Sequence, residues 1–327
     1  MSYVSFDLER SGKKCGVIGC GALGAEIGRA LAASGLFDAV VLLDEDTRLC
    51  KGQAADIAAS LPLHTSVDVW AGEYADLQGC ALIVLASGQL PLHETMESEL
   101  PFINLPILRR AIAGLSPYVG NAVLLVATQP TDLMTFVALH YSGLPAARVI
   151  GLGTLPDALQ LRRLLGRYLS ANPAQIEAMV LGQAGDNATV IWSGVRIGGM
   201  DADLWRGAQG RSCEAMILHS LYTDVRCAAA QSADAKGYGI FAAAQAAALV
   251  ACAVVRDQNS LLGLCTLSDG RFGVGNLCMS LPCIIGRGGV LAMPEPALAA
   301  AEQAELEKSA ARLRSMICRA NGLLCQT

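Results

Sequence analysis

A glycine-rich segment near the start of the chain has the residue types and spacing that bind a dinucleotide. The sequence Gly-Cys-Gly-Ala-Leu-Gly occupies residues 19–24, after a short apolar run and before a segment with helical periodicity. In that context Gly19 permits a tight turn, Gly21 lets the backbone approach a diphosphate, and Gly24 lets the helix pack closely on a strand. The helix N-terminus would present backbone N–H groups and a partial positive charge to the phosphates.

The second group with this chemistry is an acidic residue at the end of the next apolar run. Asp44 lies twenty residues after Gly24. A carboxylate in that position accepts hydrogen bonds from both hydroxyls of a ribose and repels a 2′-phosphate, so the sequence favours NAD over NADP. Arg48 is nearby, and we expect its side chain to be solvated. The pattern is typical of dinucleotide binding; a doubly wound fold with a vacant crevice is the alternative.

The elements that would position these residues alternate between strand-like and helix-like segments, as in βαβ units with a parallel sheet. The expected strands are residues 14–18, 40–44, 67–71, 81–86 and 122–128. The expected helices are residues 24–34, 53–60 and 107–115. Strands this apolar are usually covered on both faces, as a parallel sheet requires.

The second half of the chain has a different pattern. Its expected helices are residues 157–169, 213–227, 239–256 and 302–321, the last amphipathic and surface-facing. Its expected strands are residues 190–197, 261–266, 272–277 and 281–285, with the last three antiparallel. No repeat or low-complexity linker separates the halves, so we expect a mixed α/β domain without a flexible tether.

Composition indicates a compact globular protein and excludes some partners. Hydrophobic residues make up 53% of the 327 residues and charged residues 16%, which argues against a disordered chain. The net charge of −5, without a basic run, argues against a nucleic acid or an anionic membrane as partner. The longest apolar stretch, residues 241–255, contains Gln245 and is too short to span a bilayer, so it indicates a buried helix.

The twelve cysteines are scattered through mostly apolar segments and form no Cys-x-x-Cys pair. The first fourteen residues are polar, unlike a signal peptide. We therefore expect reduced, buried thiols that act as small hydrophobic side chains, and a cytoplasmic protein. The histidines show no metal-ligand spacing among themselves or with cysteines, so no metal site is expected.

Several different short motifs lie along the rest of the chain. They are Gly-Gln-Ala-Ala-Asp-Ile at 52–57, Gly-Glu-Tyr-Ala-Asp-Leu at 72–77, Gln-Pro-Thr-Asp at 129–132, Ser-Gly-Leu-Pro at 142–145, Arg-Val-Ile-Gly at 148–151, Leu-Gly-Gln-Ala-Gly-Asp at 181–186, Trp-Ser-Gly at 192–194 and Leu-Pro-Cys-Ile-Ile-Gly at 281–286. With the glycine-rich turn, they resemble the lactate/malate dehydrogenase family from residue 14 to about residue 321. The resemblance implies a Rossmann doubly wound parallel sheet that binds NAD, at residues 1–150. A lactate/malate dehydrogenase-type α/β substrate domain would follow at 151–327.

The resemblance also implies a cofactor-binding set that extends beyond the glycine-rich turn. The expected set is Gly19, Gly21, Ala22, Leu23, Gly24, Asp44, Ser87, Gly88 and Gln129. Gln129 stands where the family has an asparagine before the proline. A small-molecule ligand and a homodimer or homotetramer are implied as well.

The family reduces a 2-oxo acid with four groups, and the resemblance assigns each to a position here. A histidine donates the proton and an aspartate orients it. One arginine on a loop polarises the carbonyl, and a second clamps the carboxylate. The aspartate is retained as Asp157. The histidine falls on Ala184, the clamping arginine on Gln160 and the loop arginine near Glu97, while a pocket threonine falls on Gly239.

A methyl group cannot titrate and an amide carries no charge, so these departures bear on catalysis. Loss of the proton donor alone typically lowers the rate by about 10²–10⁴-fold. His93, in the same loop as Glu97, is a candidate replacement acid if it reaches Asp157; a solvated loop histidine is the alternative. Arg162 survives, at a position that in the family lies toward a subunit contact.

Three functions are consistent with these residues. The first is an NAD(H)-binding protein without ordinary 2-hydroxyacid dehydrogenase activity, a pseudoenzyme that acts as a ligand sensor or assembly partner. The second is a divergent NAD-dependent oxidoreductase acting on the CH–OH or ketone group of a neutral or cationic substrate, because Gln160 can hydrogen-bond a carbonyl or amide. The third is a conventional lactate or malate dehydrogenase.

Overall fold

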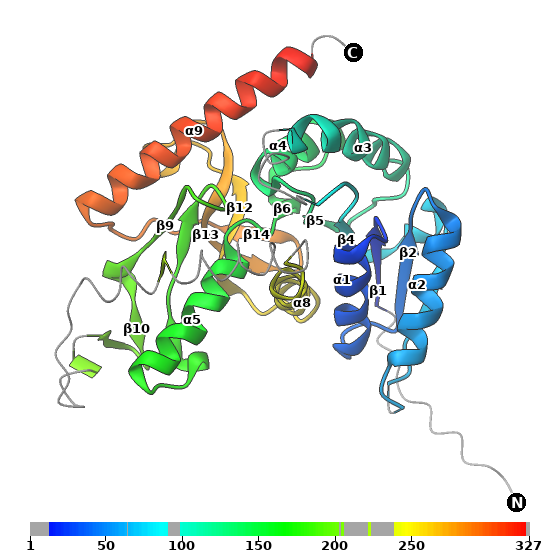
Figure 1. The fold of residues 1–327 in the computed structure, drawn as a ribbon, viewed down its shortest axis with the longest axis horizontal. Helices are drawn as coiled ribbons and strands as arrows, with labels where there is room; N and C mark the ends of the chain where they lie inside the picture. Colours follow the sequence, from blue (N-terminus) through cyan, green and yellow to red (C-terminus); the bar gives the residue numbers. More distant parts are fainter. Residues whose placement is uncertain are drawn as a thin grey trace, which may run out of the picture.

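The structure, a computed structural model, describes residues 13–63, 65–90, 99–202, 204–205, 222–223 and 239–324. His93 and Glu97 therefore lie outside the described residues, as does most of the helix expected at 213–227. Figure 1 shows the chain from the parallel sheet of the first half to the long C-terminal helix.

Six parallel strands form the first half of the main sheet. They are β1 (Lys14–Ile18), β2 (Ala39–Leu43), β3 (Asp68–Ala71), β4 (Cys80–Leu85), β5 (Val123–Val126) and β6 (Val149–Gly151). Their spatial order is β3-β2-β1-β4-β5-β6, with Lys14 opposite Ala39 and Leu85 opposite Val126. The order reverses direction beside β1, which is the doubly wound arrangement expected from the sequence. In such sheets the ligand crevice lies at the carboxyl ends of the strands, at this reversal.

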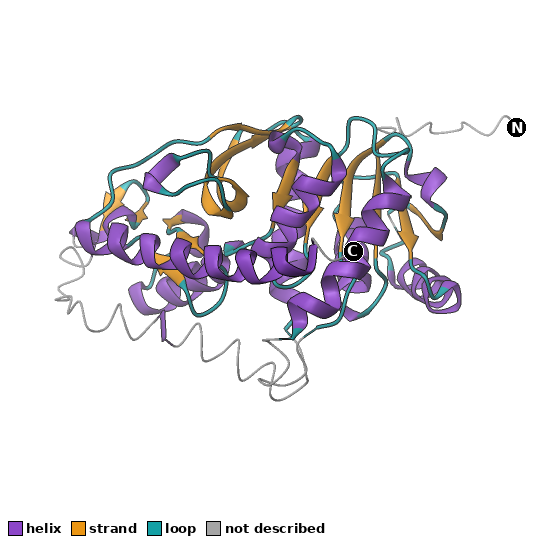
Figure 2. Ribbon diagram, turned by 90° about the horizontal axis from the view of Figure 1, so that it is seen from above, coloured by secondary structure: helices purple, strands orange, loops and turns teal. Residues whose placement is uncertain are grey.

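Helices cover both faces of this sheet, as Figure 2 shows from above. One face packs against α1 (Ala22–Ala33), α2 (Thr47–Ser60) and α8 (Phe241–Val255). The other packs against α3 (Leu100–Leu115) and α4 (Thr131–Ser142), and α9 (Ala300–Leu324) continues this apolar layer beside α4. Side chains alternate along each strand, so Val84 contacts the first helix layer and Leu85 the second. Both are fully buried, which explains why these strands are apolar throughout.

The sheet continues into the second half of the chain through antiparallel strands. β6 pairs with β12 (Ser260–Leu267) at one bridge, Cys265 opposite Gly151, and β12 pairs along its length with β13 (Cys278–Gly286). The remaining strands of this half are β7 (Ile176–Glu177), β8 (Val180–Gly182), β9 (Ala188–Val190), β10 (Arg196–Ile197), β11 (Met200–Asp201) and β14 (Gly289–Ala292). The helix α5 (Leu155–Leu169) packs on β7 and β8 in a separate apolar cluster.

The helix α8 lies between α5 and α1 in Figure 1 and contacts both. Its sequence is rich in alanine, and Ala247, Val250 and Ala251 are fully buried. The expected buried helix at 241–255 is therefore confirmed. Among the described residues, no helix is both long and apolar enough to cross a membrane.

Two expected strands are wrong. The segment 272–277 begins with a 3-10 turn, η6 (Arg271–Gly273), because the preceding Asp269 and Gly270 have positive φ angles and reverse the chain. The segment 190–197 is broken by another 3-10 turn, η5 (Trp192–Gly194), which leaves only short strands on either side.

Two helices begin earlier than their apolar periodicity indicates. The helix α2 starts at Thr47 because the Asp46 carboxylate caps it, accepting from the N–H groups of Arg48 and Leu49 at 3.0 Å. The helix α3 starts at Leu100 with Pro101 in its first turn, where a missing N–H costs no hydrogen bond. No helix was expected at α4, because its polar residues Thr131, Asp132 and Thr135 are buried together with its apolar ones.

Candidate functional site

The glycine-rich turn connects β1 to α1 in a conformation that requires glycine at two positions. Gly19 has φ of +99°, and its N–H donates to the Leu43 carbonyl at 2.7 Å. A Cβ on Gly24 would lie 1.7 Å from the Gly19 carbonyl oxygen. By contrast, a Cβ on Gly21 would meet nothing within 4 Å, so the turn is open there. This cradle, open only at its middle glycine, fits a diphosphate that approaches the backbone.

The first residues of α1 offer their backbone rather than their side chains to this cradle. Leu23 is 5% exposed and packs into the core, and Ala22 is partly buried. The N-cap residue, Gly21, has no side chain that could accept from the first N–H groups of the helix. These N–H groups at a helix N-terminus are the donors that a phosphate needs.

Asp44 follows β2 and lies beside the turn. One carboxylate oxygen, Oδ2, accepts from the Cys20 N–H at 2.5 Å, and the other, Oδ1, accepts from the Asp46 N–H at 2.9 Å. These bonds fix the carboxylate between the turn and the start of α2, while the side chain stays partly exposed. A carboxylate has about four lone-pair sites, so two backbone donors leave capacity for ribose hydroxyls. The residues present therefore fit NAD.

The predicted residues Ser87, Gly88 and Gln129 follow β4 and β5, at the same edge of the sheet. The Ser87 hydroxyl donates to the Ile18 carbonyl at 3.0 Å, which ties the end of β4 to the end of β1. Asn104, on α3, accepts from the Gln89 N–H at 2.7 Å and donates to the Gln129 carbonyl at 2.8 Å.

Asn104 was not identified from the sequence, because the helix expected there begins at residue 107 and the observed α3 begins at Leu100. It is fully buried. A Cβ on Gly88, whose φ is +134°, would lie 2.7 Å from the Asn104 Oδ1. The asparagine therefore holds two loops of the predicted cofactor edge against each other.

On the substrate side, Asp157 and Gln160 lie three residues apart on α5. Residues at this spacing are neighbours on one face of a helix, and both side chains are partly buried. Thr154 is the N-cap residue of the helix and Pro156 lies in its first turn, where it is tolerated. The expected helix start is thus confirmed to within two residues.

Ala184 lies after β8, and its backbone is tied to a buried carboxyl group. The Ala184 N–H donates to Oδ2 of Asp132, on α4, at 2.7 Å. Asp132 is 2% exposed, and its other oxygen, Oδ1, accepts no well-aligned hydrogen bond from the described residues. Burial raises the Asp132 pKa to about 6, and the charge of Asp157 adds to the rise. The Ala184 N–H and the Cys265 thiol act in the opposite direction and lower the pKa. Asp132, Asp157 and Ala184 thus form one electrostatic group from three segments.

The remaining predicted residues are not brought into this group by the described structure. Gly239 is exposed just before α8. Arg162, two residues beyond Gln160, points away from it, because residues at that spacing do not share a helix face. Burial lowers the Arg162 pKa, and the charge of Glu177, on β7, opposes this shift. His93 and Glu97 stay predictions.

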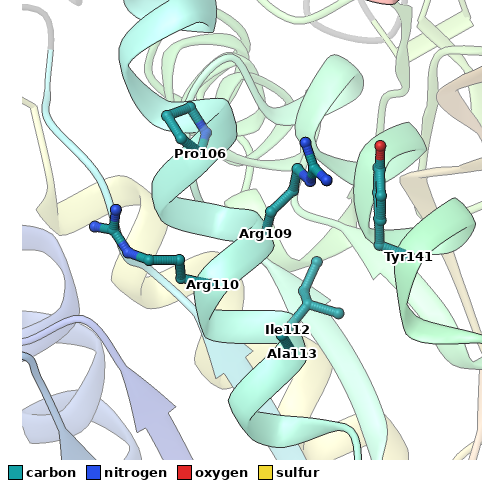
Figure 3. Close-up of a pocket in the computed structure, with 6 residues that line it drawn as sticks. All are labelled: Pro106, Arg109, Arg110, Ile112, Ala113 and Tyr141. Atoms are coloured by element: carbon teal, nitrogen blue, oxygen red, sulfur yellow. The ribbon is translucent and has the colours of Figure 1, made fainter. Parts of the chain in front are cut away.

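A cavity of about 400 Å³ lies between α3 and α4 (Figure 3). Arg109 lies over the Tyr141 ring, 4.7 Å from its centroid, and Arg110 points the other way, where its Nε is 3.0 Å from Glu45 Oε1. None of the predicted cofactor or substrate residues lines this cavity.

Comparison with known proteins gives two family matches. Residues 13–151 match the lactate/malate dehydrogenase NAD binding domain. Residues 154–322 match the lactate/malate dehydrogenase alpha/beta C-terminal domain.

Whole proteins match over nearly their full length. The chain is 32% identical over 304 residues to the L-lactate dehydrogenase of Thermoanaerobacter pseudethanolicus, covering 93% of this chain and 98% of the relative. It is 34% identical over 303 residues to that of Salinibacter ruber, covering 91% and 95%. A crystal structure of a lactate dehydrogenase from a deep-sea metagenome library superposes with a TM-score of 0.88 at 26% identity, covering 95% of this chain and 99% of that one. This chain is a member of the lactate/malate dehydrogenase family, and its N-terminal half is an NAD-binding domain.

Proposed function

We propose that this protein binds NAD(H) but does not catalyse ordinary 2-hydroxyacid dehydrogenation, and that it acts as a ligand sensor or assembly partner. The observation that carries the proposal is the group around Ala184. Asp157 is retained there, but the residue it would orient is a methyl group, and Gln160 offers an amide in place of a guanidinium. NADH, when bound, supplies a hydride; the family chemistry also needs a proton donor and a carboxylate clamp.

The energetics support this assignment of function. Removing a charge-assisted clamp from a desolvated carboxylate costs about 2–5 kcal/mol of binding. Removing the proton donor lowers the rate by a further factor of about 10²–10⁴. Together these effects would reduce turnover of a 2-oxo acid by several orders of magnitude, while the cradle for NAD keeps the features that bind it.

A second candidate is an oxidoreductase for neutral ketones or alcohols, favoured by Asp132. Its carboxyl group accepts a hydrogen bond from the backbone N–H of Ala184, and a pKa of about 6 leaves about one tenth of these groups protonated at pH 7. Gln160 could hydrogen-bond a neutral carbonyl or amide. In this reading a carboxyl group near residue 184 replaces the imidazole as the proton source.

The test begins with NADH binding, measured by fluorescence, and continues with NADH consumption. Pyruvate, oxaloacetate and a panel of neutral ketones are the substrates, and the L-lactate dehydrogenase of Salinibacter ruber is assayed in parallel. We expect saturable NADH binding without measurable turnover of either acid. A kcat/KM for pyruvate or oxaloacetate close to that of the relative would refute the proposal and identify a conventional dehydrogenase. Turnover of a neutral ketone would establish the second candidate.

Restoring the missing groups provides the converse experiment. The double variant Ala184→His, Gln160→Arg should gain pyruvate reduction by at least about 100-fold, because it returns a proton donor and a clamp beside Asp157. Adding Asp157→Asn should remove most of the gain, since the new imidazole loses the carboxylate that orients and charges it. A gain of the same size from Gln160→Arg alone would show that the proton donor was never missing.

The assembly part of the proposal is measured separately. We infer a homodimer or homotetramer, because the family resemblance implies one. Size-exclusion chromatography with light scattering determines the mass in solution. A monomer that binds NADH would refute the role as an assembly partner and would be consistent with the role as a ligand sensor.

A further inference from the structure

Two cysteine sulfurs are in contact inside the predicted NAD-binding cradle. Cys20 lies between the first two glycines of the turn, and Cys50 lies in the first part of α2. Their Sγ atoms are 3.4 Å apart, and the two residues are 0% and 2% exposed. A disulfide needs an S–S distance of about 2.05 Å, so the two sulfurs must approach by roughly 1.4 Å to form one.

The surroundings of the two thiols tolerate such a bond. The Cys20 thiol also donates to the Leu43 carbonyl and the Cys50 thiol to the Leu42 carbonyl, at 3.3 and 3.2 Å. Both carbonyls keep a backbone donor if the thiol protons are lost, because Gly19 and Gly72 also donate to them, at 2.7 and 2.9 Å. Oxidation would therefore leave neither buried carbonyl oxygen without a hydrogen-bond donor.

The two thiols differ in acidity. Burial raises the pKa of both. The contact between the two sulfurs raises the Cys20 pKa further and lowers that of Cys50. These raised pKa values keep both thiols mostly protonated at neutral pH; Cys50, whose pKa is raised less, supplies the small thiolate population that acts as the nucleophile in cysteine oxidation.

We propose that Cys20 and Cys50 are an oxidation site whose disulfide lowers the affinity of the protein for NAD(H). Hydrogen peroxide is the oxidant we assign. The Cys50 thiolate attacks one peroxide oxygen, so an S–O bond forms, the O–O bond breaks and hydroxide leaves. The Cys20 sulfur then attacks the Cys50 sulfenic acid; the S–S bond forms, the S–O bond breaks, and water leaves with the Cys20 proton. The sum is two thiols and one peroxide to one disulfide and two waters.

The disulfide acts on the cradle because Cys20 is part of its backbone. The Cys20 N–H bonds to Asp44 at 2.5 Å, so moving Cys20 toward α2 disturbs the carboxylate predicted to hold the ribose. The turn has no slack to absorb the motion, since a Cβ on Gly19 or Gly24 would already collide with backbone at 2.4 or 1.7 Å. Hydrogen bonds to a diphosphate depend steeply on distance and angle, so the displacement weakens them.

The path of the oxidant follows from the same geometry. Gly21, next to Cys20, is exposed and has open space where a Cβ would lie. This is the space in which a diphosphate would approach the backbone. Peroxide that enters here reaches Cys20 and the Cys50 sulfur 3.4 Å beyond it, so we expect bound NADH to close this approach and protect the pair from oxidation.

The experiment treats the full-length reduced protein with hydrogen peroxide, with and without saturating NADH. Peptide mapping after alkylation should find a Cys20–Cys50 disulfide and a mass loss of two hydrogens for that pair. The dissociation constant for NADH, measured by fluorescence, should rise at least about tenfold, and dithiothreitol should restore it. The reduced protein is first titrated with NADH. A protein that does not bind NADH at all is therefore distinguished from one that binds NADH but forms no disulfide.

Two variants serve as controls. Cys50→Ser keeps a hydroxyl that can donate to the Leu42 carbonyl but cannot form the bond, so its affinity for NADH should not respond to peroxide. Cys318→Ala removes an exposed thiol on α9, far along the chain, and should respond as the native protein does.

Three results would overturn the proposal. The first is that Cys20 and Cys50 remain alkylatable thiols after Cys318 has been oxidised. The second is that the disulfide forms without changing the affinity for NADH. The third, which needs no variant, is that saturating NADH leaves the rate of disulfide formation unchanged.

Discussion

The glycine-rich turn and the segment around Ala184 both have their backbone fixed by hydrogen bonds, but they differ in whether the functional side chain is retained. At the turn, the backbone geometry and the Asp44 carboxylate are both preserved, with Asp44 anchored by two N–H groups. At Ala184 the backbone is anchored to Asp132 at 2.7 Å, and that of its neighbour Gln183 to the Ser309 hydroxyl at 2.8 Å. The reactive side chain, however, is absent. The position of a backbone and the chemistry of its side chain are therefore separable in this fold.

The largest effect is expected from a substitution in the glycine-rich turn, the better preserved of the two regions. Gly24→Ala places a methyl group 1.7 Å from the Gly19 carbonyl oxygen, which neither backbone can avoid. We expect the free energy of unfolding to fall by more than about 3 kcal/mol and NADH binding to be lost. Urea denaturation and fluorescence titration measure the two effects.

Two further glycine positions, at which an added Cβ would meet no other atom, serve as controls for that result. Gly21→Ala should leave the free energy of unfolding within about 0.5 kcal/mol of the native value but lower the affinity for NADH, because its methyl group occupies the open part of the cradle. Gly52→Ala, in α2, should leave NADH binding unchanged and add up to about 1 kcal/mol of stability. Normal NADH binding by Gly24→Ala would mean that the close approach is not needed.

Asp44→Ala addresses cofactor choice and has the next largest effect. Loss of hydrogen bonds from a charged group should lower the affinity for NADH by about 10–100-fold. The affinity for NADPH should fall less, because the repulsion of its 2′-phosphate is removed, so the preference for NADH narrows. Titration with both cofactors measures the ratio. Asp46→Ala, which removes only the α2 cap, should cost about 1 kcal/mol of stability and leave the ratio unchanged.

A smaller effect is expected at Asp132, as a dependence of stability on pH. Its pKa is raised to about 6 by burial, from 3.8, so the folded state favours the protonated form. The contribution to stability is complete below pH 3.8 and is lost as the pH rises through about 6. Relative to Asp132→Asn, the native protein should therefore lose about 2–3 kcal/mol between pH 4 and pH 8. Urea denaturation across this range measures the difference, and parallel curves for the two proteins would contradict a raised pKa.

Much of the fold followed from the sequence because apolar runs, glycines and short motifs report local structure directly. The strand at Lys14–Ile18 has the predicted bounds, since every residue after Lys14 is buried between two helix layers. Periodicity failed where long-range contacts decide the structure. The helix α4 buries Asp132 and Thr135 beside its apolar residues, so it has no polar face for a pattern to detect.

The candidate site divides in the same way. The glycines and Asp44 could be predicted because their spacing along the chain sets their chemistry. Asn104 and Asp132 are brought to the site by tertiary packing, and their hydrogen bonds span fifteen or more residues of sequence. The contact between Cys20 and Cys50 has the same origin: thirty residues of chain separate two thiols that no local motif relates.

The helix α8 has a consequence for how the molecule is made. Ile27 and Leu31 of α1 share a core cluster with Ala247 and Ala251, which are translated more than two hundred residues later. During synthesis the apolar side of the nucleotide-binding half therefore stays uncovered until α8 has left the ribosome. A fragment ending at β6 would also leave that strand without its partner, β12. The half of the chain that carries the cofactor site therefore completes its core only after the rest of the chain has been made.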